Sequence, residues 1–121
     1  MIAAGQIVLF RFPQTDQGRG KWRPALVLRR LPGPYDDWLI CMISSRLHQA
    51  SAELDEVVAP NDPDFPASGL KTASLIRTTR VAVVAAERLE GALGHLATGR
   101  LDRVRARLAA WLVADAMAPV H

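Results

Sequence analysis

Short apolar runs that end at prolines or glycines fill most of this chain, and they constrain its fold more than any other feature. The clearest covers residues 38–43, Trp-Leu-Ile-Cys-Met-Ile, and follows the turn Pro32-Gly33-Pro34. Comparable runs occupy residues 6–12, 25–28, 73–78 and 81–85, and residues 53–58 leave room for another strand. Short bounded runs of β-branched and aromatic residues are typical of strands. We therefore expect a chain that is mainly β.

Two of these runs are separated only by Thr79 and Arg80. The pair is too short and too polar to be more than a kink or tight corner, so it joins either two closely spaced strands or one long bent strand. Residues 60–66 differ, because their prolines lack the N–H that a strand ladder needs. An exposed connection is expected there.

The spacing of apolar residues changes near the end of the chain. Apolar positions follow spacings of three and four, at Leu101, Val104, Leu108, Trp111 and Leu112, and Asp115 continues the series. The remaining faces carry mainly arginines, at Arg100, Arg103, Arg105 and Arg107. The pattern predicts an amphipathic helix that starts near Thr98 and Gly99 and stops before Pro119. Strands followed by one helix predict a small α+β barrel, with one domain over residues 1–121.

Composition bears on the number of domains, the cellular compartment and the charge of a partner. With 121 residues, half of them hydrophobic, the chain is long enough for one core. Its single cysteine, Cys41, excludes a disulfide framework, fits a reducing compartment and is expected to be a buried small hydrophobe. Without a signal-like start or a long apolar span, the protein is expected to be soluble and cytoplasmic. Its net charge of +3, mostly from arginine, favours an anionic partner.

Several site types are not expected. The histidines are His48, His95 and His121, and none lies at ligand spacing from another His or Cys, so we expect neither a metal nor a cofactor. Two acidic pairs, Asp36-Asp37 and Asp62 with Asp64, lie among turn residues and are interpreted as turn formers. Gly18-Arg19-Gly20 is too short for a nucleotide loop and is either a hairpin tip or a flap over a site.

Two other segments place polar groups beside buried strands. In Arg23-Pro24, proline holds the preceding residue extended, which puts a guanidinium just before the run at residues 25–28. The run at 38–43 ends in Ser44-Ser45-Arg46, so two hydroxyls and another guanidinium follow it. Taken alone, an arginine before a strand is more often structural or solvated, and the second segment is more often an ordinary loop start.

Together these segments resemble a known family. Gly5-Gln6-Ile7-Val8-Leu9, Phe12-Pro13 and Arg23-Pro24-Ala25-Leu26-Val27-Leu28 closely resemble, in order and spacing, the opening of the MazF/PemK toxins. Cys41-Met42-Ile43-Ser44-Ser45 resembles the family's next strand, which ends in a catalytic threonine or serine. Ser68-Gly69-Leu70-Lys71 resembles a further block, and Ile76-Arg77-Thr78 with residues 89–96 resembles the closing strand and the approach to the last helix. The resemblance covers almost the whole chain.

The resemblance implies an SH3-like β-barrel of the CcdB/MazF-like type with a C-terminal helix. It also implies the toxin of a type II toxin–antitoxin system that cleaves single-stranded RNA without a metal. In that reaction the ribose 2′-hydroxyl attacks its own phosphate and leaves a 2′,3′-cyclic phosphate and a 5′-hydroxyl. The partners it implies are RNA, a cognate antitoxin and a second copy in a homodimer.

Residue roles follow from the same resemblance. Arg23 corresponds to the catalytic arginine and Ser44 to the catalytic hydroxyl. Arginine stays protonated and is a poor base, so Arg23 is assigned to charge stabilisation and to proton donation to the leaving group. His48 is the candidate base, although an exposed loop histidine is the commoner explanation for such a residue. The predicted RNA contacts are Phe12, Arg19, Lys21, Ser45, Arg46 and Arg77, and Trp22 either stacks on bases or packs the loop base.

The chain departs from the family pattern at two positions. Arg11 stands where the family often has an acidic residue, which bears on base specificity, and Ser44 stands where many members have threonine. Two other functions stay open: a non-catalytic module that binds RNA or a peptide, and a gyrase poison of the CcdB kind. The combination of Arg23 with Ser44 favours the ribonuclease, because gyrase poisons do not need it.

Overall fold

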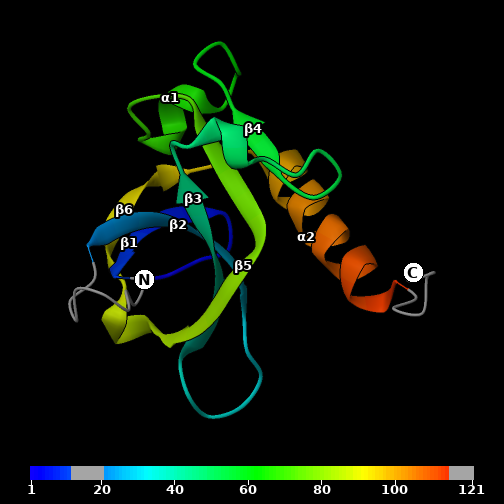
Figure 1. The fold of residues 1–121 in the computed structure, drawn as a ribbon. Coiled ribbons are helices and arrows are strands. Elements are labelled where there is room, and N and C mark those ends of the chain that lie inside the picture. Colours follow the sequence, from blue (N-terminus) through cyan, green and yellow to red (C-terminus); the bar gives the residue numbers. More distant parts are fainter. Residues whose placement is uncertain (12–20, 115–121) are drawn as a thin grey trace.

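The structure is a computed structural model that describes residues 1–11 and 21–114 (Figure 1). Its described elements comprise six strands, two short 3-10 helices and two α-helices. In chain order they are β1 (Gln6–Arg11), β2 (Trp22–Arg30), β3 (Asp37–Ser44), η1 (Leu47–Gln49), β4 (Glu56–Val58), α1 (Phe65–Ser68), β5 (Ser74–Ala85), η2 (Ala86–Arg88), β6 (Glu90–His95) and α2 (Thr98–Val113). The predicted class, mainly β with one C-terminal helix, is confirmed.

The strands form one curled sheet in the order β4-β5-β3-β2-β1-β6. Every pairing between them is antiparallel. The central strands β3 and β2 are paired on both sides, and residues 25–28 in the middle of β2 are buried without a break, so both faces of β2 are covered there. Figure 1 shows the sheet wrapping around itself while α2 lies along one side of it.

Alternate residues of the strands feed two apolar clusters, as the period of two in a strand requires. One face of the sheet packs against α2 through residues that include Ile7, Leu26, Cys41, Ile43, Ile76, Leu101, Val104 and Leu108. The other cluster contains Val8, Phe10, Ala25, Val27, Trp38, Ile40, Val84 and Leu89. Cys41 is fully buried, as expected, and this burial, with the charge of Asp55, raises the pKa of its thiol.

The boundary at Thr79 and Arg80 is a bend in one long strand. β3 pairs with β5 through Cys41↔Val81 and then Met42↔Arg77, so residues 78–80 form a bulge. Thr78 stabilises the bulge, because its amide donates to Asp55 Oδ1 (3.0 Å) and its hydroxyl donates to the Leu54 carbonyl (2.6 Å). The alternative with two separate strands is therefore wrong.

Two other boundaries differ from the sequence interpretation. β2 starts at Trp22, so Arg23 lies inside the strand and not before it. β6 is a full strand, although its sequence, Glu-Gly-Ala-Leu-Gly-His, has little strand character and only the family resemblance suggested it. The proline-rich connection contains the single turn α1, which ends at Gly69 with a positive φ of 74°.

The helix α2 starts at Thr98 as predicted, and Leu101, Val104 and Leu108 are buried. Two predictions about its faces are wrong. Arg100 is only 8% exposed, whereas Trp111 and Leu112 are exposed at 49% and 65%. The helix extends past the sheet at its C-terminal end (Figure 1), so its last apolar residues have no sheet to cover. Asp115 and Pro119 lie outside the described residues.

No helix within residues 1–11 and 21–114 is long and apolar enough to cross a membrane.

Candidate active site at the ends of β2 and β3

A cleft of about 340 Å³ lies where β2 begins and β3 ends. Its walls come from four parts of the chain: the start of β2, the end of β3 with the turn after it, the segment between α1 and β5, and β6. The described residues that line it are Trp22, Arg23, Pro24, Ile43, Ser44, Ser45, Arg46, Gly69, Leu70, Lys71, Thr72, Ser74 and Leu93. Four predicted site residues, Arg23, Ser44, Ser45 and Arg46, therefore meet in one cavity.

The strand register brings Arg23 and Ser44 together. β2 and β3 pair through Ala25↔Met42, and extending this antiparallel register by two residues places Arg23 opposite Ser44. Directly opposite residues in an antiparallel pair project from the same face with their Cβ atoms about 5 Å apart. A guanidinium and a hydroxyl from two different strands thus come to one end of the sheet.

The hydroxyl of Ser44 also shapes the turn that follows. Its Oγ accepts a hydrogen bond from the backbone N–H of Arg46 (3.0 Å), which is a local side-chain turn typical of serine. In this bond Ser44 is the acceptor, so its own O–H proton can still be donated. The turn exposes Ser45 and Arg46 at the mouth of the cleft.

The electrostatic character of the cleft is strongly cationic. Its described lining contains the side chains of Arg23, Arg46 and Lys71 and no carboxylate or imidazole. Within residues 1–11 and 21–114, none of these three cations has a carboxylate within ion-pair distance. Clustered charge of one sign beside low-dielectric walls concentrates counter-ions, so the cleft favours a polyanion.

Trp22 forms part of the cleft rim and is 43% exposed. It pairs with Arg11 across β1 and β2, and the Arg11 guanidinium carbon lies 4.6 Å from the ring centroid. This cation–π contact covers one face of the indole and fixes another guanidinium close to the cleft. The Trp22 side chain thus packs against Arg11 and also remains partly exposed at the rim of the cleft.

Three other predicted residues do not line the cleft. Lys21 is exposed just before β2, and His48 is exposed in η1. Arg77 is engaged elsewhere, because its Nη1 donates to Gln49 Oε1 (2.7 Å) and its Nε lies 3.9 Å from Asp55 Oδ2. Arg77 thus ties β5 to η1 and to the loop after it. Phe12 and Arg19 lie outside the described residues.

Lys71 and Thr72 are cleft residues to which the sequence pattern assigns no role. They come from the connection between α1 and β5, where a single lysine carries no local signal. Two close backbone contacts fix this connection against β6: a Cβ on Gly69 would lie 2.2 Å from the Leu93 carbonyl oxygen, and one on Gly94 would lie 2.1 Å from that of Ala67. Glycine at both positions is therefore a detectable sequence signal of close chain approach.

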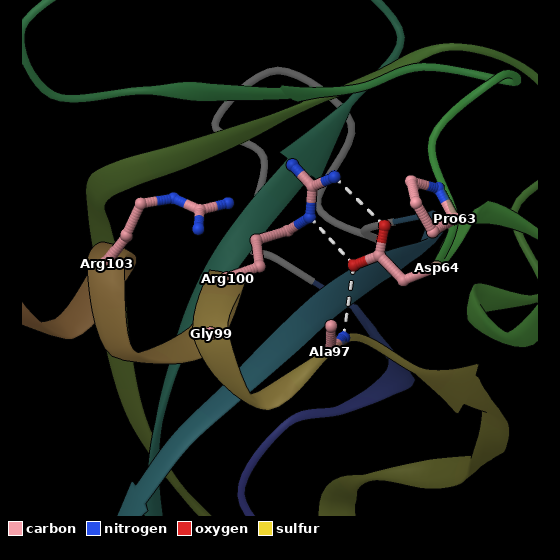
Figure 2. Close-up of a pocket in the computed structure, with 6 residues that line it drawn as sticks. All are labelled: Pro63, Asp64, Ala97, Gly99, Arg100 and Arg103. Carbon is pink, nitrogen blue, oxygen red and sulfur yellow. Dashed lines mark hydrogen bonds and ion pairs between the residues drawn. The ribbon is translucent and has the colours of Figure 1, made fainter.

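A second cavity, of about 320 Å³, lies beside the start of α2 and has a different character. Figure 2 shows Arg100 reaching from α2 to Asp64, which also accepts a bond from the backbone N–H of Ala97 (3.1 Å). Arg100 donates to Asp64 through Nε (2.8 Å) and Nη2 (2.9 Å). Its other N–H groups donate to Glu56, to Asp62 and to the Val57 carbonyl. All five donors of this guanidinium are used.

The surrounding charges balance. Glu56 also accepts from Arg103 (2.8 Å) and lies 3.3 Å from Arg107, so three arginines face three carboxylates in this network. The hydrogen bonds from Arg100 lower the pKa of Asp64, and the Ala59 N–H lowers that of Asp62. Asp62 thus forms the expected turn, but interpreting this acidic pair only as turn formers was incomplete.

Similarity to known proteins extends over nearly the whole chain. The family described as PemK-like, MazF-like toxin of type II toxin–antitoxin system matches residues 3–112. The chain belongs to this toxin family. No curated protein matches it. Among solved structures it is similar to an "Endoribonuclease in complex with its cognate antitoxin from Mycobacterial species", with a TM-score of 0.63 and 12% identity over 95% of this chain and 98% of that chain.

At that identity the structural likeness establishes the fold alone. Together with the family it confirms the expected CcdB/MazF-like fold, here a curled six-stranded sheet with one C-terminal helix. The blocks that carried the resemblance lie mainly on β1, β2, β3, β5 and β6 of this toxin-family sheet.

Proposed function

We propose that this toxin-family chain is an endoribonuclease that cleaves single-stranded RNA in the cleft between β2, β3 and Lys71. The observation that carries the proposal is the cation set of that cleft: Arg23, Arg46 and Lys71 line it without a carboxylate among the described lining residues. Such a cavity matches an RNA backbone, whose phosphates supply the missing negative charge. Membership of the toxin family and the likeness to a solved endoribonuclease support the same activity.

The proposed reaction is attack by the ribose 2′-hydroxyl on the adjacent phosphate. The bond from phosphorus to the 5′-oxygen breaks, leaving a 2′,3′-cyclic phosphate and a 5′-hydroxyl. Negative charge grows on the phosphate oxygens in the transition state, and preorganised donors stabilise it most where water is excluded. Arg23 is suited to this task and to donating a proton to the leaving oxygen, and the Ser44 hydroxyl holds the scissile phosphate by donating a hydrogen bond to one of its oxygens.

The remaining cations have a different task in this proposal. Arg46 follows β3 and Lys71 precedes β5, and the two bind phosphates that flank the scissile one. Trp22 offers the ring face not covered by Arg11 to an unpaired base. Predicted contacts from Phe12, Arg19, Lys21 and Ser45 extend the binding surface, whereas Arg77 is occupied by Gln49 and Asp55.

The group that removes the 2′-hydroxyl proton is not supplied by the described lining, which holds no carboxylate or imidazole. His48 remains the candidate because it lies two residues beyond Arg46, in η1. Its test is the pH–rate profile of His48→Gln. Loss of the lower limb of the profile supports His48 as the base, and an unchanged profile removes it from the mechanism.

One experiment tests the activity itself. Purified protein is incubated with a long defined RNA in EDTA, beside Ser44→Ala and a DNA supercoiling assay, and the RNA ends are mapped. Metal-independent cutting with cyclic phosphate ends is expected, reduced in Ser44→Ala. Binding of RNA without any cleavage would instead favour a binding module, and inhibition of supercoiling alone would favour a gyrase poison.

The proposal includes partners. As a toxin of a type II system, the chain is expected to bind a cognate antitoxin and to form a homodimer in the cytoplasm. The solved neighbour supports the first partner, since that endoribonuclease is in complex with its cognate antitoxin. A disordered antitoxin segment that folds over the cleft would occlude it at an entropic cost. Light scattering with and without the antitoxin gives both stoichiometries.

A further inference from the structure

The saturated guanidinium of Arg100 lies outside the RNA cleft, yet it binds the same chain segment that forms one cleft wall. That segment begins at Asp62 and Asp64, passes through α1 and reaches Lys71 and Thr72. Only five residues separate Asp64 from Leu70, the first of the run Leu70–Thr72 that lines the cleft. A displacement at Asp64 is therefore transmitted over a very short stretch.

The stretch between them is stiff. The Ser68 hydroxyl donates to the Phe65 carbonyl (2.6 Å) and accepts from the Leu70 N–H (3.1 Å), and Ser68 is fully buried. Gly69 and Gly94 allow α1 to lie directly on β6, at distances where any Cβ would collide with the backbone. The segment is thus held on one side by β6 and on the other by Arg100.

The α2 side of this arrangement is equally defined. Arg100 lies in the first turn of α2 and donates two parallel hydrogen bonds to Asp64, a geometry that fixes direction as well as distance. Asp64 also accepts the Ala97 N–H at the helix N-terminus, where a negative charge is favoured. A lysine, a point charge with three donors, cannot reproduce the five bonds.

We propose that Arg100 is a positioning residue for RNA binding, acting through Asp64 and α1 to hold Lys71 against the cleft. The proposal rests on the proposed function, because it concerns the same cleft. It differs from a purely structural role in what it predicts: loss of the Arg100–Asp64 bond weakens RNA binding in molecules that remain folded. A purely structural role would reduce only the fraction of folded protein.

The test compares Asp64→Asn with two matched controls. Asp102→Asn makes the same substitution on the exposed partner of Arg105, in the same helix as Arg100. Val84→Ala lowers stability through the other apolar cluster, which contains no residue of the segment at residues 59–72. The measurements are KM and kcat for RNA cleavage, the Kd for an RNA blocked by 2′-O-methyl groups, and amide hydrogen exchange of residues 65–72.

For Asp64→Asn we expect KM and Kd to rise on the order of tenfold, with a smaller change in kcat, because misplacing a binding group by about 1 Å has large effects. Faster exchange at residues 65–72 should accompany the change, and both controls should keep the wild-type Kd. If Asp64→Asn does not fold, Asp62→Asn removes a single Arg100 bond and provides the same test on a smaller scale.

Equal Kd values for Asp64→Asn and Val84→Ala would overturn the proposal, as would unchanged exchange at residues 65–72. A wild-type protein that binds the blocked RNA without cleaving unblocked RNA would contradict the proposed catalytic function, while the Kd and exchange data would still judge Arg100. The two failures are therefore distinguishable.

Discussion

Two groups of arginines in this molecule have opposite surroundings. Arg23 and Arg46 line a cleft in which no described carboxylate pairs with them, whereas Arg100 is buried and uses all five N–H donors within the protein itself. Guanidiniums are chemically identical at both sites, so the neighbours decide the role. Unmatched cations are suited to an external anion, and matched cations are suited to holding the chain together.

The difference also separates two expected consequences of mutation. In the proposed function, removing a cleft arginine takes away an interaction that exists only when RNA is bound. Removing Arg100 leaves the buried Asp64 without its arginine partner, and Glu56 and Asp62 each lose one of their partners. Substitution of Arg23 or Arg46 should therefore lower activity without lowering stability, whereas substitution of Arg100 should lower stability and, through Lys71, RNA binding as well.

The largest effect on stability is expected for Arg100→Leu. Breaking a buried ion pair by removing one partner typically costs about 3–5 kcal/mol, because the remaining charges are left uncompensated. Urea unfolding followed by circular dichroism measures the change in the free energy of unfolding. Arg105→Leu is the control, since that arginine pairs with the exposed Asp102 and donates one bond to the Leu28 carbonyl, and it should change stability by about 1 kcal/mol or less. If both variants lose a similar amount of unfolding free energy, the buried network around Arg100 does not stabilise the fold more than an ordinary surface ion pair.

A smaller loss is expected for Gly94→Ala. The added Cβ would lie 2.1 Å from the Ala67 carbonyl oxygen, which forces β6 and α1 apart and costs roughly 1–3 kcal/mol. Gly91→Ala, in the same strand with nothing within 4 Å of its Cβ position, is the control and should be close to neutral. The same unfolding assay compares them, and equal stabilities would show that the close approach of α1 to β6 is not needed.

The smallest effect concerns acid. Because Arg100 lowers the pKa of Asp64 in the folded state, this interaction stabilises the fold fully above the ordinary aspartate pKa of about 3.9 and is lost as the pH falls through the lowered value. Asp62, Glu56 and Arg103 face the same site and share its charge network. Unfolding curves between about pH 5 and pH 2 should fall less steeply for Asp64→Asn than for wild type. Parallel curves would contradict the assigned coupling.

The sequence predicted the strands and the last helix because their apolar patterns are local. It also brought Arg23, Ser44, Ser45 and Arg46 into one candidate site, through the resemblance to the family and not through any property of the residues alone. The apolar pattern does not predict β6, because its six residues include two glycines and are mostly exposed. β6 forms because it pairs with β1. The six residues of β6 do not by themselves encode that pairing.

Arg100 shows most clearly what a one-dimensional pattern cannot contain. Helical periodicity places it among the polar positions of α2, and that inference fails because its partners come from residues 56–64, far earlier in the chain. Lys71 escaped for the same reason, since its place in the cleft depends on where α1 is fixed. Both residues depend on long-range contacts that only the folded chain reveals.

We propose that Arg23 contributes to RNA cleavage and not to the stability of the fold. The direct measurement determines two quantities on one preparation of Arg23→Ala: the rate of RNA cleavage in EDTA and the free energy of unfolding in urea. The rate should fall by about 10²–10³-fold or more, with the free energy of unfolding within about 0.5 kcal/mol of wild type. Unchanged cleavage by a well-folded Arg23→Ala protein would contradict it, and so would a loss of activity that merely follows a loss of stability.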